Sequence, residues 1–374
     1  MVSGTAAVYT KPHTFELMNL PVPEVEPGGL LVKITSAGIC GSDLHYWRGD
    51  IPPSFWAGGS EGGVILGHEM MGVVQALGKG VDRDSMGQPL REGDRVAYTY
   101  FFPCLRCYNC LRGELNTCPN RTRFRRTVES FPYCTGGYSE YFYLPPGHFV
   151  FKMPDELSDE LATSANCATA QVIFGLRKAG VGMGDQVVIQ GAGGLGINAV
   201  AAAKEMGAET VIAIDGQADR LQLAEDCGAD YTVNIREYNT VETRTARVRE
   251  FTQGRGADIA LELVGFPDAL VESFSLVRPG GTIVEIGCMW PNSTTQLDVS
   301  KFVWNNVTVI GIAHYDPYIL PVALDFLVRT KDKYPLGKIM SHSFSLEDIT
   351  DAFRQSEWLG KEDGSKITRA FVKP

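Results

Sequence analysis

The pattern of hydrophobic and polar residues changes near residue 185 of the 374-residue chain. Before that point, short apolar runs such as LLVKITSAG and DRVAYTYF alternate with many glycine and proline breakers, which predicts an irregular, loop-rich β domain. After it, short apolar runs such as DQVVIQ and TVIAID alternate with helical segments such as LGINAVAAAKEMG and ADRLQLAEDCG. Strands and helices joined by such short connections predict βαβ units and a parallel sheet that helices cover on both faces.

These patterns predict an α/β chain of two domains. We expect the β-rich domain over residues 1–158, with a cysteine-containing lobe at 103–119, and the doubly wound domain over 159–310. The remaining segment, 311–374, is too short to fold alone. We therefore expect this segment to return to the first domain.

The composition is that of a soluble globular protein, with 44% hydrophobic residues and a formal net charge of −10. An acidic chain of this kind does not favour binding to nucleic acid or to an anionic membrane. The first residues lack the basic and apolar regions of a signal peptide, and polar residues interrupt the most apolar stretch, 186–214, so that it cannot span a bilayer. We expect a cytoplasmic protein, in which clustered cysteines are more often metal ligands or catalytic groups than disulfides.

A glycine-rich turn, QGAGGLG, follows a predicted strand and opens a predicted helix. Its G-x-G-x-x-G pattern is formed by Gly191, Gly193 and Gly196, and the turn also contains Gly194 and Leu195. Glycine at these places allows a tight turn, a close approach of the backbone to a pyrophosphate, and close packing of the helix on the strand. The free N–H groups at the helix start attract phosphate, so the turn predicts a dinucleotide-binding site.

Asp215 stands at the end of the next predicted strand, nineteen residues beyond Gly196. A carboxylate at that place can accept hydrogen bonds from the ribose hydroxyls of the cofactor, and it would repel a 2′-phosphate. The nearest arginine, Arg220, already lies in the following helix, so the sequence favours NAD over NADP. The alternative is a structural turn with an acidic residue at the start of the helix.

Four cysteines occur in the segment PCLRCYNCLRGELNTCP with the spacing C-x2-C-x2-C-x7-C; they are Cys104, Cys107, Cys110 and Cys118. Four thiolates this close can fill a tetrahedral shell around zinc and leave no position for water, which is the structural type of site. Pro119 after the last cysteine resembles an iron–sulfur motif, but the last gap is seven residues instead of three. A structural zinc is the favoured interpretation, and a cluster, disulfides or unrelated cysteines stay open.

Cys40, in AGICGSDLH, and His68, in LGHE, have no second ligand nearby, and each alone is more typical of a structural residue. The order of the motifs along the chain changes the interpretation of these two residues. AGICGSDLH, GHEMMGVV, REGDRV, the four-cysteine segment, ATSANCATAQVIFGL and QGAGGLG follow one another as in the zinc-dependent medium-chain alcohol dehydrogenase family, which the chain resembles over nearly its whole length. The resemblance implies a GroES-like catalytic domain split around a Rossmann domain, with two zinc ions and NAD as cofactors.

The resemblance also implies roles for single residues. Cys40, His68 and Cys167 match the ligands of the catalytic zinc, although polyol-type members often carry glutamate in place of Cys167. Glu69 matches an acidic residue that can approach or transiently bind the metal. Asp43 matches a carboxylate that orients the histidine ligand, a role with a general physical basis.

The activity implied by this resemblance is reversible hydride transfer from an alcohol to NAD, which gives an aldehyde or ketone. Three protein ligands leave one position of a tetrahedral zinc open for an alcohol oxygen, and the metal lowers the pKa of the hydroxyl. Ser42 resembles the hydroxyl of the family's proton relay, and His45 the histidine that passes the proton to water, a task suited to a near-neutral pKa. A purely structural histidine is the alternative for His45.

Two segments depart from the family pattern. The segment 46–63 is long and aromatic, and Trp47, Phe55 and Trp56 could line a pocket for a bulky or aromatic alcohol, or pack within a surface loop or subunit contact. The arginines within 121–126 could hold an anion, although a solvated face is the simpler interpretation.

Three alternative functions and one hypothesis on assembly remain. A polyol dehydrogenase of the same family, a zinc-free reductase and a non-catalytic NAD-binding relative are the alternatives to an alcohol dehydrogenase. The family also implies a homodimer or homotetramer, for which the apolar strand NVTVIGI is the candidate interface because an unpaired apolar edge invites a second copy.

Overall fold

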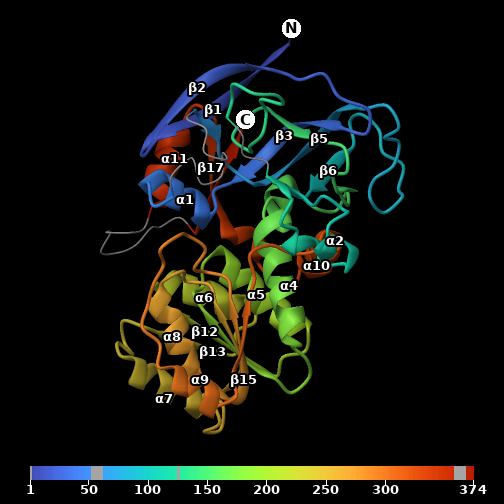
Figure 1. The fold of residues 1–374 in the computed structure, drawn as a ribbon. Helices are drawn as coiled ribbons and strands as arrows, with labels where there is room; N and C mark the ends of the chain where they lie inside the picture. Colours follow the sequence, from blue (N-terminus) through green and yellow to red (C-terminus); the bar gives the residue numbers. More distant parts are fainter. Residues whose placement is uncertain (1, 52–61, 124–126, 358–367) are drawn as a thin grey trace. The chain divides into compact units, whose positions relative to one another are not determined.

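The computed structural model describes residues 2–51, 62–123, 127–357 and 368–374 (Figure 1). The chain forms two compact units. The first unit consists of residues 1–170, 314–328 and 340–374, and the second of 171–313 and 329–339. Within the described residues, no helix is long and apolar enough to cross a membrane.

The first unit is built on a mainly antiparallel sheet with the strand order β10-β6-β5-β3-β18-β17, in which β9 also pairs with β3. Its strands are β3 (Leu30–Gly38), β5 (Glu69–Leu77), β6 (Arg95–Tyr98), β9 (Tyr141–Leu144), β10 (Val150–Lys152), β17 (Met340–Ser345) and β18 (Arg369–Lys373). Strand β3 is buried along most of its length, as expected for a central strand. Strand β18 pairs with β3, so the last residues of the chain belong to this sheet.

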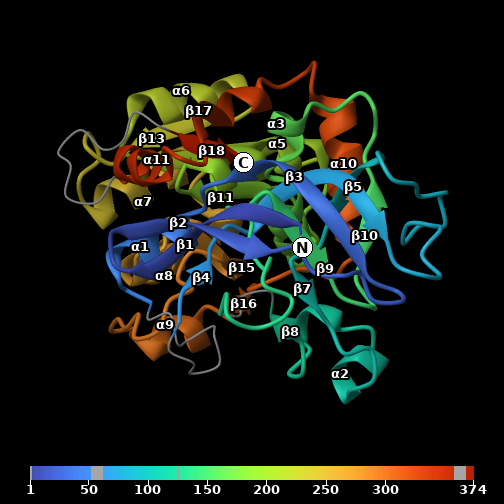
Figure 2. The same cartoon turned by 90° about the horizontal axis from the view of Figure 1, so that it is seen from above.

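A second sheet of the first unit has the order β2-β1-β4, and β7 and β8 form a separate two-stranded sheet. These strands are β1 (Ser3–Lys11), β2 (Thr14–Pro21), β4 (Val64–Ile65), β7 (Phe101–Phe102) and β8 (Thr122–Arg123). The helices of this unit are α1 (Gly41–Arg48), α2 (Tyr108–Leu111), η2 (Leu115–Thr117), α3 (Asp159–Ala162), η3 (Ala165–Thr169), most of α10 (Ile319–Thr330), and α11 (Ile349–Ser356). Figure 2 shows α2 and β8 projecting from the other strands of this unit.

The second unit is a parallel sheet with the order β13-β12-β11-β14-β15-β16. Its strands are β11 (Gln186–Gln190), β12 (Thr210–Asp215), β13 (Tyr231–Asn234), β14 (Ala257–Glu262), β15 (Val277–Glu285) and β16 (Thr308–Gly311). The first strand in sequence lies in the middle, between β12 and β14, so the chain reverses its direction of growth there. This is the dinucleotide-binding Rossmann order, and the doubly wound sheet predicted from the sequence is confirmed.

The helices of the second unit are α4 (Ala170–Ala179), α5 (Gly194–Glu205), α6 (Ala218–Asp226), α7 (Val241–Phe251), α8 (Pro267–Leu276), α9 (Val299–Trp304) and η4 (Leu336–Ile339). Helices α5 and α6 pack on β11, β12 and β13, whereas α8 packs on β14 and β15 and also contacts α7. Because crossovers between parallel strands are right-handed, the helices before and after the reversal at β11 lie on opposite faces of the sheet. The core under α7 and α8 is made of apolar side chains such as Val188, Ile212, Val248 and Phe274.

Candidate active site and metal centres

Cys40 lies where strand β3 gives way to helix α1. It is the N-cap residue of α1 and is buried. Its backbone N–H donates to Oδ2 of Asp43, 3.1 Å away, which satisfies one of the free N–H groups at the helix start. Helix geometry therefore places the thiol of Cys40 and the carboxylate of Asp43 at the same end of α1.

His68 precedes strand β5 and is held between an acid and a thiol. Its Nδ1 faces Oδ1 of Asp43 at 3.7 Å, and its Nε2 lies 3.3 Å from Sγ of Cys167. Asp43 is fixed in turn by the hydroxyl of Tyr138, which donates to Oδ2 at 3.0 Å. A carboxylate facing Nδ1 favours a proton on that nitrogen and leaves Nε2 as the metal-binding atom.

Cys167 lies on η3, a single π-helical turn of the kind that is frequent at functional sites. The neighbouring Asn166 anchors this turn, because its side-chain Nδ2 donates to the backbone carbonyls of His68, Met70 and Tyr98 at 3.0, 3.2 and 3.1 Å. One amide group thus fixes the segments that carry two of the predicted ligands. Sequence reasoning missed Asn166, since nothing in its local pattern distinguishes it from another polar residue.

Cys40, His68, Glu69 and Cys167 converge in the first unit. One ligand atom from each lies within 4.8 Å of the others, and all four residues are buried. The structure thus brings together the residues that the sequence proposed for one metal. Two sulfurs, one imidazole nitrogen and a carboxylate oxygen are the donors that zinc prefers.

The charges of this cluster also suit a cation. A hydrogen bond with Cys167, opposed by burial and supported by His68, holds the pKa of Cys40 well below its usual range. The same hydrogen bond, together with burial, raises the pKa of Cys167 well above its usual range. Burial lowers the pKa of His68, but the charges of Cys40 and Asp43 outweigh it and raise the pKa to about 10. A divalent cation would supply the positive charge that the cluster now takes from protons.

Glu69 is the first residue of β5 and is fully buried. Its Oε2 accepts a hydrogen bond from Nη1 of Arg369 on β18, and among the described residues its Oε1 has no hydrogen-bond partner. Burial raises the pKa of Glu69 to about 7, against the opposing charge of Arg369. Arg369 is a second residue that sequence reasoning missed, because it lies 300 residues from its partner in an otherwise ordinary strand.

The two residues proposed for proton transfer lie one turn apart on α1. Ser42 is buried, and the side chain of His45 is 15% exposed. Nδ1 of His45 lies 2.8 Å from Oδ2 of Asp50 and 2.9 Å from Nη2 of Arg48. Burial lowers the pKa of His45, so its imidazole is neutral near pH 7 and can accept a proton.

The four cysteines of the lobe form a second convergent set, with Sγ atoms within 4.8 Å of one another. Sγ of Cys107 lies 3.4 Å from that of Cys110 and 3.8 Å from that of Cys118. Zn–S bonds of about 2.3 Å in a tetrahedron place the sulfurs about 3.8 Å apart. All four thiols are free, and the four cysteines of an iron–sulfur cluster would be divided among two or four irons, which requires a wider set. The geometry therefore fits a single ion.

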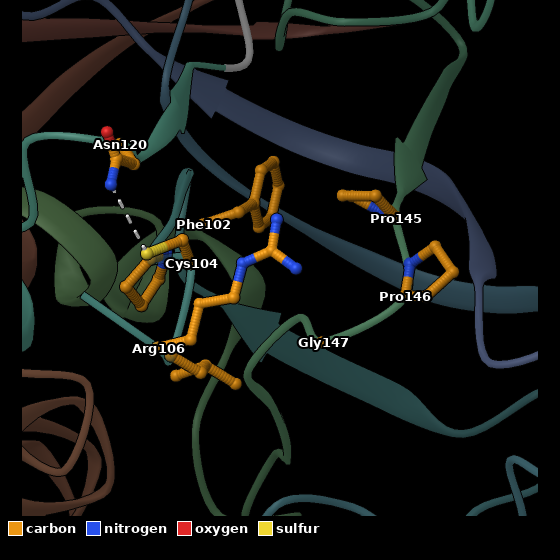
Figure 3. A pocket seen from close by; sticks show the side chains of 9 residues that line it. Phe102, Cys104, Arg106, Asn120, Pro145, Pro146 and Gly147 are labelled. Carbon is orange, nitrogen blue, oxygen red and sulfur yellow. Dashed lines mark hydrogen bonds between the residues drawn. The ribbon is translucent and has the colours of Figure 1, made fainter. Parts of the chain in front are cut away.

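A cavity of about 370 Å³ opens beside this lobe (Figure 3). Its lining includes Phe102, Cys104, Asn120 and Pro145, and the side chain of Arg106 extends across it. The residues of the buried cluster do not line it. We therefore do not assign the cavity to the substrate.

The aromatic segment and the arginine group can be placed only in part. Trp47 is buried and stacks on Phe15 at a ring-centroid distance of 5.8 Å, with Phe353 5.5 Å away, so it packs within the first unit. Phe55 and Trp56 lie outside the described residues, as do Arg125 and Arg126. Arg121 donates to the backbone carbonyl of Asn116 at 2.9 Å.

The glycine turn of the second unit joins β11 to α5. Gly191 has φ 91°, and a Cβ on Gly196 would lie 1.8 Å from the carbonyl oxygen of Gly191, so each position requires glycine. Asp215 ends β12, and its two carboxylate oxygens accept from the backbone N–H groups of Ala192 and Gln217, each at 2.8 Å. The carboxylate thus lies against the glycine turn, and Arg220 lies in α6.

Two family models match the chain. The alcohol dehydrogenase GroES-like domain matches residues 26–155, and the zinc-binding dehydrogenase domain matches residues 194–329. The chain is 31% identical to a 5-exo-hydroxycamphor dehydrogenase of Pseudomonas putida, over 94% of this chain and 95% of the relative. It is 33% identical to a sorbitol dehydrogenase of Bacillus subtilis, over 94% and 93% of the two chains.

Among solved structures, an alcohol dehydrogenase of Thermotoga maritima superposes with a TM-score of 0.89 at 31% identity, over 100% of both chains. The chain therefore belongs to the zinc-dependent medium-chain alcohol dehydrogenase family and is a dehydrogenase of that family. The family and the fold class predicted from the sequence, a GroES-like and a Rossmann domain, are confirmed.

The contacts of Asp43 generate a prediction for Asp43→Asn. The amide keeps the size of the side chain but loses the negative charge that faces Nδ1 of His68, so we expect zinc affinity of the Cys40 site to fall about 10- to 100-fold. Competition with a chromogenic chelator measures this affinity. Asp82→Asn, at an exposed carboxylate of the same unit, is the control and should bind zinc as the parent does. Equal affinities in the two variants would exclude an orienting role for Asp43.

Proposed function

We propose that the chain is an NAD-dependent zinc alcohol dehydrogenase, which transfers a hydride from an alcohol to NAD and gives an aldehyde or ketone. The observation that carries this proposal is the buried convergence of Cys40, His68 and Cys167 in the first unit. The glycine turn and Asp215 of the second unit support the choice of cofactor.

Zinc would be held by the two thiolates and by Nε2 of His68, and Glu69 beside them could approach or transiently bind the metal. Three protein ligands leave one position of a tetrahedral site open, which is typical of catalytic zinc sites. When bound, zinc supplies the positive charge that lowers the pKa of the substrate hydroxyl. The lobe cysteines would hold a second zinc, with no position open to substrate.

The remaining steps belong to side chains of the chain. Asp43 keeps the ring of His68 in place through Nδ1. Ser42 takes the proton that the alcohol releases, and His45 passes it toward solvent, for which its neutral imidazole and partial exposure are suited. Both groups lie on α1, the helix that begins at Cys40.

Aromatic side chains around the cluster favour a bulky, largely apolar alcohol. The ring of Tyr100 lies 4.8 Å from that of His68, and its hydroxyl lies 4.0 Å from Sγ of Cys167. His314 and Tyr315 pack against Phe101 at 5.0 and 5.4 Å. The relative that acts on hydroxycamphor supports this class of substrate. The sorbitol dehydrogenase relative supports a polyol instead, whereas cysteine at position 167 argues against it.

Zinc content and turnover test the proposal. We expect about two zinc ions per chain, and Cys40→Ala should lose one of them and its turnover with every alcohol of a panel of apolar, aromatic and polyol substrates. Cys104→Ser should lose the other zinc and stability first, and activity only through that loss. Metal analysis, thermal unfolding and absorbance of reduced nicotinamide distinguish the variants. Undiminished turnover in Cys40→Ala would exclude the metal mechanism, and a folded wild-type chain with zinc but no turnover would favour the non-catalytic alternative.

Cofactor choice gives a separate prediction for Asp215→Asn. The amide retains an acceptor for the backbone N–H of Ala192 but no longer repels a 2′-phosphate, so the ratio of kcat/KM for NAD to that for NADP should fall about tenfold or more. Asp219→Asn removes the same charge from an exposed position in α6 and should leave the ratio nearly unchanged. A parent enzyme that prefers NADP would contradict the assignment of NAD.

We also propose that two copies pair through strand β16. Among the described strands, β16 pairs with β15 alone, and Val309 on it is 40% exposed. Helix α9 adds exposed apolar side chains, with Val303 65% and Trp304 83% exposed. An apolar edge strand beside such a patch is typical of a surface that a second copy covers.

Val309→Lys tests this interface. A lysine on the edge strand disfavours pairing of two such edges, so sedimentation velocity should show a smaller species than the parent forms. Met183→Lys, at a side chain that is 97% exposed in the same unit, should leave the assembly unchanged. An unchanged oligomer in Val309→Lys would place the interface elsewhere.

A further inference from the structure

Two glutamates stand side by side at the carboxyl ends of adjacent parallel strands in the second unit. Glu262 ends β14 and Glu285 ends β15, and the two are register partners. Glu262 has no exposed surface. One carboxylate oxygen from each, together with Sγ of Cys288, lies within 4.8 Å of the others.

Each carboxyl group has one oxygen engaged by backbone and one oxygen without a donor. Oε1 of Glu262 accepts from the N–H groups of Val264 and Gly265 at 2.7 and 2.8 Å, and Oε1 of Glu285 accepts from the N–H of Cys288 at 2.8 Å. Both Oε2 atoms are buried, and no donor among the described residues reaches them. A buried oxygen without a donor is costly, and two of them in adjacent carboxylates repel each other.

A single proton removes both difficulties, because a carboxylic acid donates one hydrogen bond to a neighbouring carboxylate. Burial raises the pKa of Glu262 to about 8, and the charge of Glu285 contributes to the same shift. The pair therefore retains this proton at neutral pH. Cys288 adds no charge, because burial raises the pKa of its thiol to about 12. Helix α8, which packs on both strands, carries Asp268 and Glu272.

Both of these helix carboxylates have partners of their own. Asp268 accepts from Thr295 at 2.7 Å, and Glu272 forms an ion pair with Arg244 at 2.6 Å. The strand ends that flank the pair, Gln190 on β11 and Gly311 on β16, carry no charge.

The turns that follow the two glutamates are in contact with each other and with the dinucleotide turn. A Cβ on Gly287 would lie 2.3 Å from Oε2 of Glu262 and 2.5 Å from the backbone nitrogen of Gly265. A Cβ on Gly191, the first glycine of the dinucleotide motif, would lie 3.2 Å from the nitrogen of Val264. Glu262 therefore lies where the turns after β11, β14 and β15 meet, at the carboxyl edge of the sheet where Rossmann domains bind their ligands.

We propose that Glu262 and Glu285 share one proton, and that this protonated pair positions the turns 263–265 and 286–288 to receive the nicotinamide cofactor. The inference rests on the proposed function for the identity of the cofactor. The two glutamates are positioning residues: they act through the backbone N–H groups that they hold. Loss of the proton leaves two adjacent carboxylates, one fully buried and one partly buried, which repel each other and separate the two turns.

The proposal predicts a pH dependence of definite sign. The protonated pair binds cofactor, so affinity is constant below the pKa of the pair and falls as the pH rises above about 8, by up to tenfold for each pH unit for one linked proton. The unfolded chain holds no such proton at neutral pH. The raised pKa therefore also makes the stability contributed by this proton decrease as the pH rises from the acidic range toward 8.

Fluorescence titration of the intact protein with NADH across this pH range tests the inference. Glu262→Gln keeps an acceptor for the N–H groups of Val264 and Gly265, and its amide N–H replaces the shared proton. We expect this variant to bind NADH as the parent does at neutral pH and to lose the decline above pH 8. Glu285→Gln should behave alike and serves as the second variant if the first does not fold. Glu209→Gln, at an exposed carboxylate of the same unit, should retain the parental pH profile.

Infrared spectroscopy measures the protonation of the carboxyl pair directly and does not depend on cofactor binding. The carbonyl band of protonated carboxyl groups should contain a component that persists at neutral pH and disappears only well above pH 8, and this component should be missing from Glu262→Gln, whereas any contribution of Glu69, whose pKa is about 7, should be the same in both proteins. A parental pH profile or an unchanged band in both glutamine variants would overturn the inference. A metal ion bound in addition to those of the two cysteine sites, and lost in Glu262→Gln, would replace the proton by a cation and also overturn it. A wild-type chain that binds neither NADH nor NADPH contradicts the proposed function, while the infrared band still decides whether the proton is shared.

Discussion

The ion pair between Glu69 and Arg369 is the contact on which the candidate active site depends most. It joins the start of β5, next to His68, to the last strand of the chain, and both side chains are buried. Breaking a buried ion pair leaves an uncompensated charge, a far larger cost than the loss of a surface pair. The carboxyl-terminal strand is therefore needed at this site for its charge as well as for its backbone hydrogen bonds to β3. Arg369 occupies one oxygen of Glu69, the other oxygen has no hydrogen-bond partner among the described residues, and a carboxylate oxygen of Glu69 lies within 4.8 Å of the ligand atoms of Cys40, His68 and Cys167.

The two cysteine-rich sites differ in how the fold supports them. The ligands of the buried cluster come from a helix start, a strand start and a π-helical turn, which Asp43 and Asn166 connect by hydrogen bonds. The lobe has little such support: its helix α2 spans only Tyr108–Leu111, with Tyr108 73% and Leu111 77% exposed. A segment that buries so little apolar surface would gain its stability from the zinc ion proposed for it. With zinc bound as proposed, the first site could keep its shape while one coordination position stays open, whereas the second would depend on all four sulfurs.

Sequence patterns were sufficient for the features that local chemistry determines. The alternation of apolar strands and helices predicted the parallel sheet of the second unit, and the glycine spacing predicted the turn in which Gly196 approaches Gly191. The residues Cys40, His68 and Cys167 were brought together by the order of motifs, since their spacing along the chain carries no geometric information. Arg369 and Asn166 were missed because their importance comes from contacts across 300 and 98 residues of sequence. The role of Trp47 in the packing of the first unit was missed for the same reason, because its partner Phe353 lies on α11.

Buried acidic groups in this chain are neutralised in different ways, and the difference follows from what each needs to do. Asp43 faces an imidazole and a tyrosine hydroxyl, which keep it fixed against His68. Glu69 faces a guanidinium, whose charge does not depend on pH in the range where proteins fold. Among the described residues, Glu262 faces another carboxyl group, a thiol and backbone N–H groups, so a proton is the counter-charge that these surroundings allow. A proton is smaller than any side chain, and it lets the turns after β14 and β15 approach more closely than an arginine or lysine between them would permit. The close contact of Gly287 with Glu262 requires such a small counter-charge, and it makes the separation of these two turns sensitive to pH.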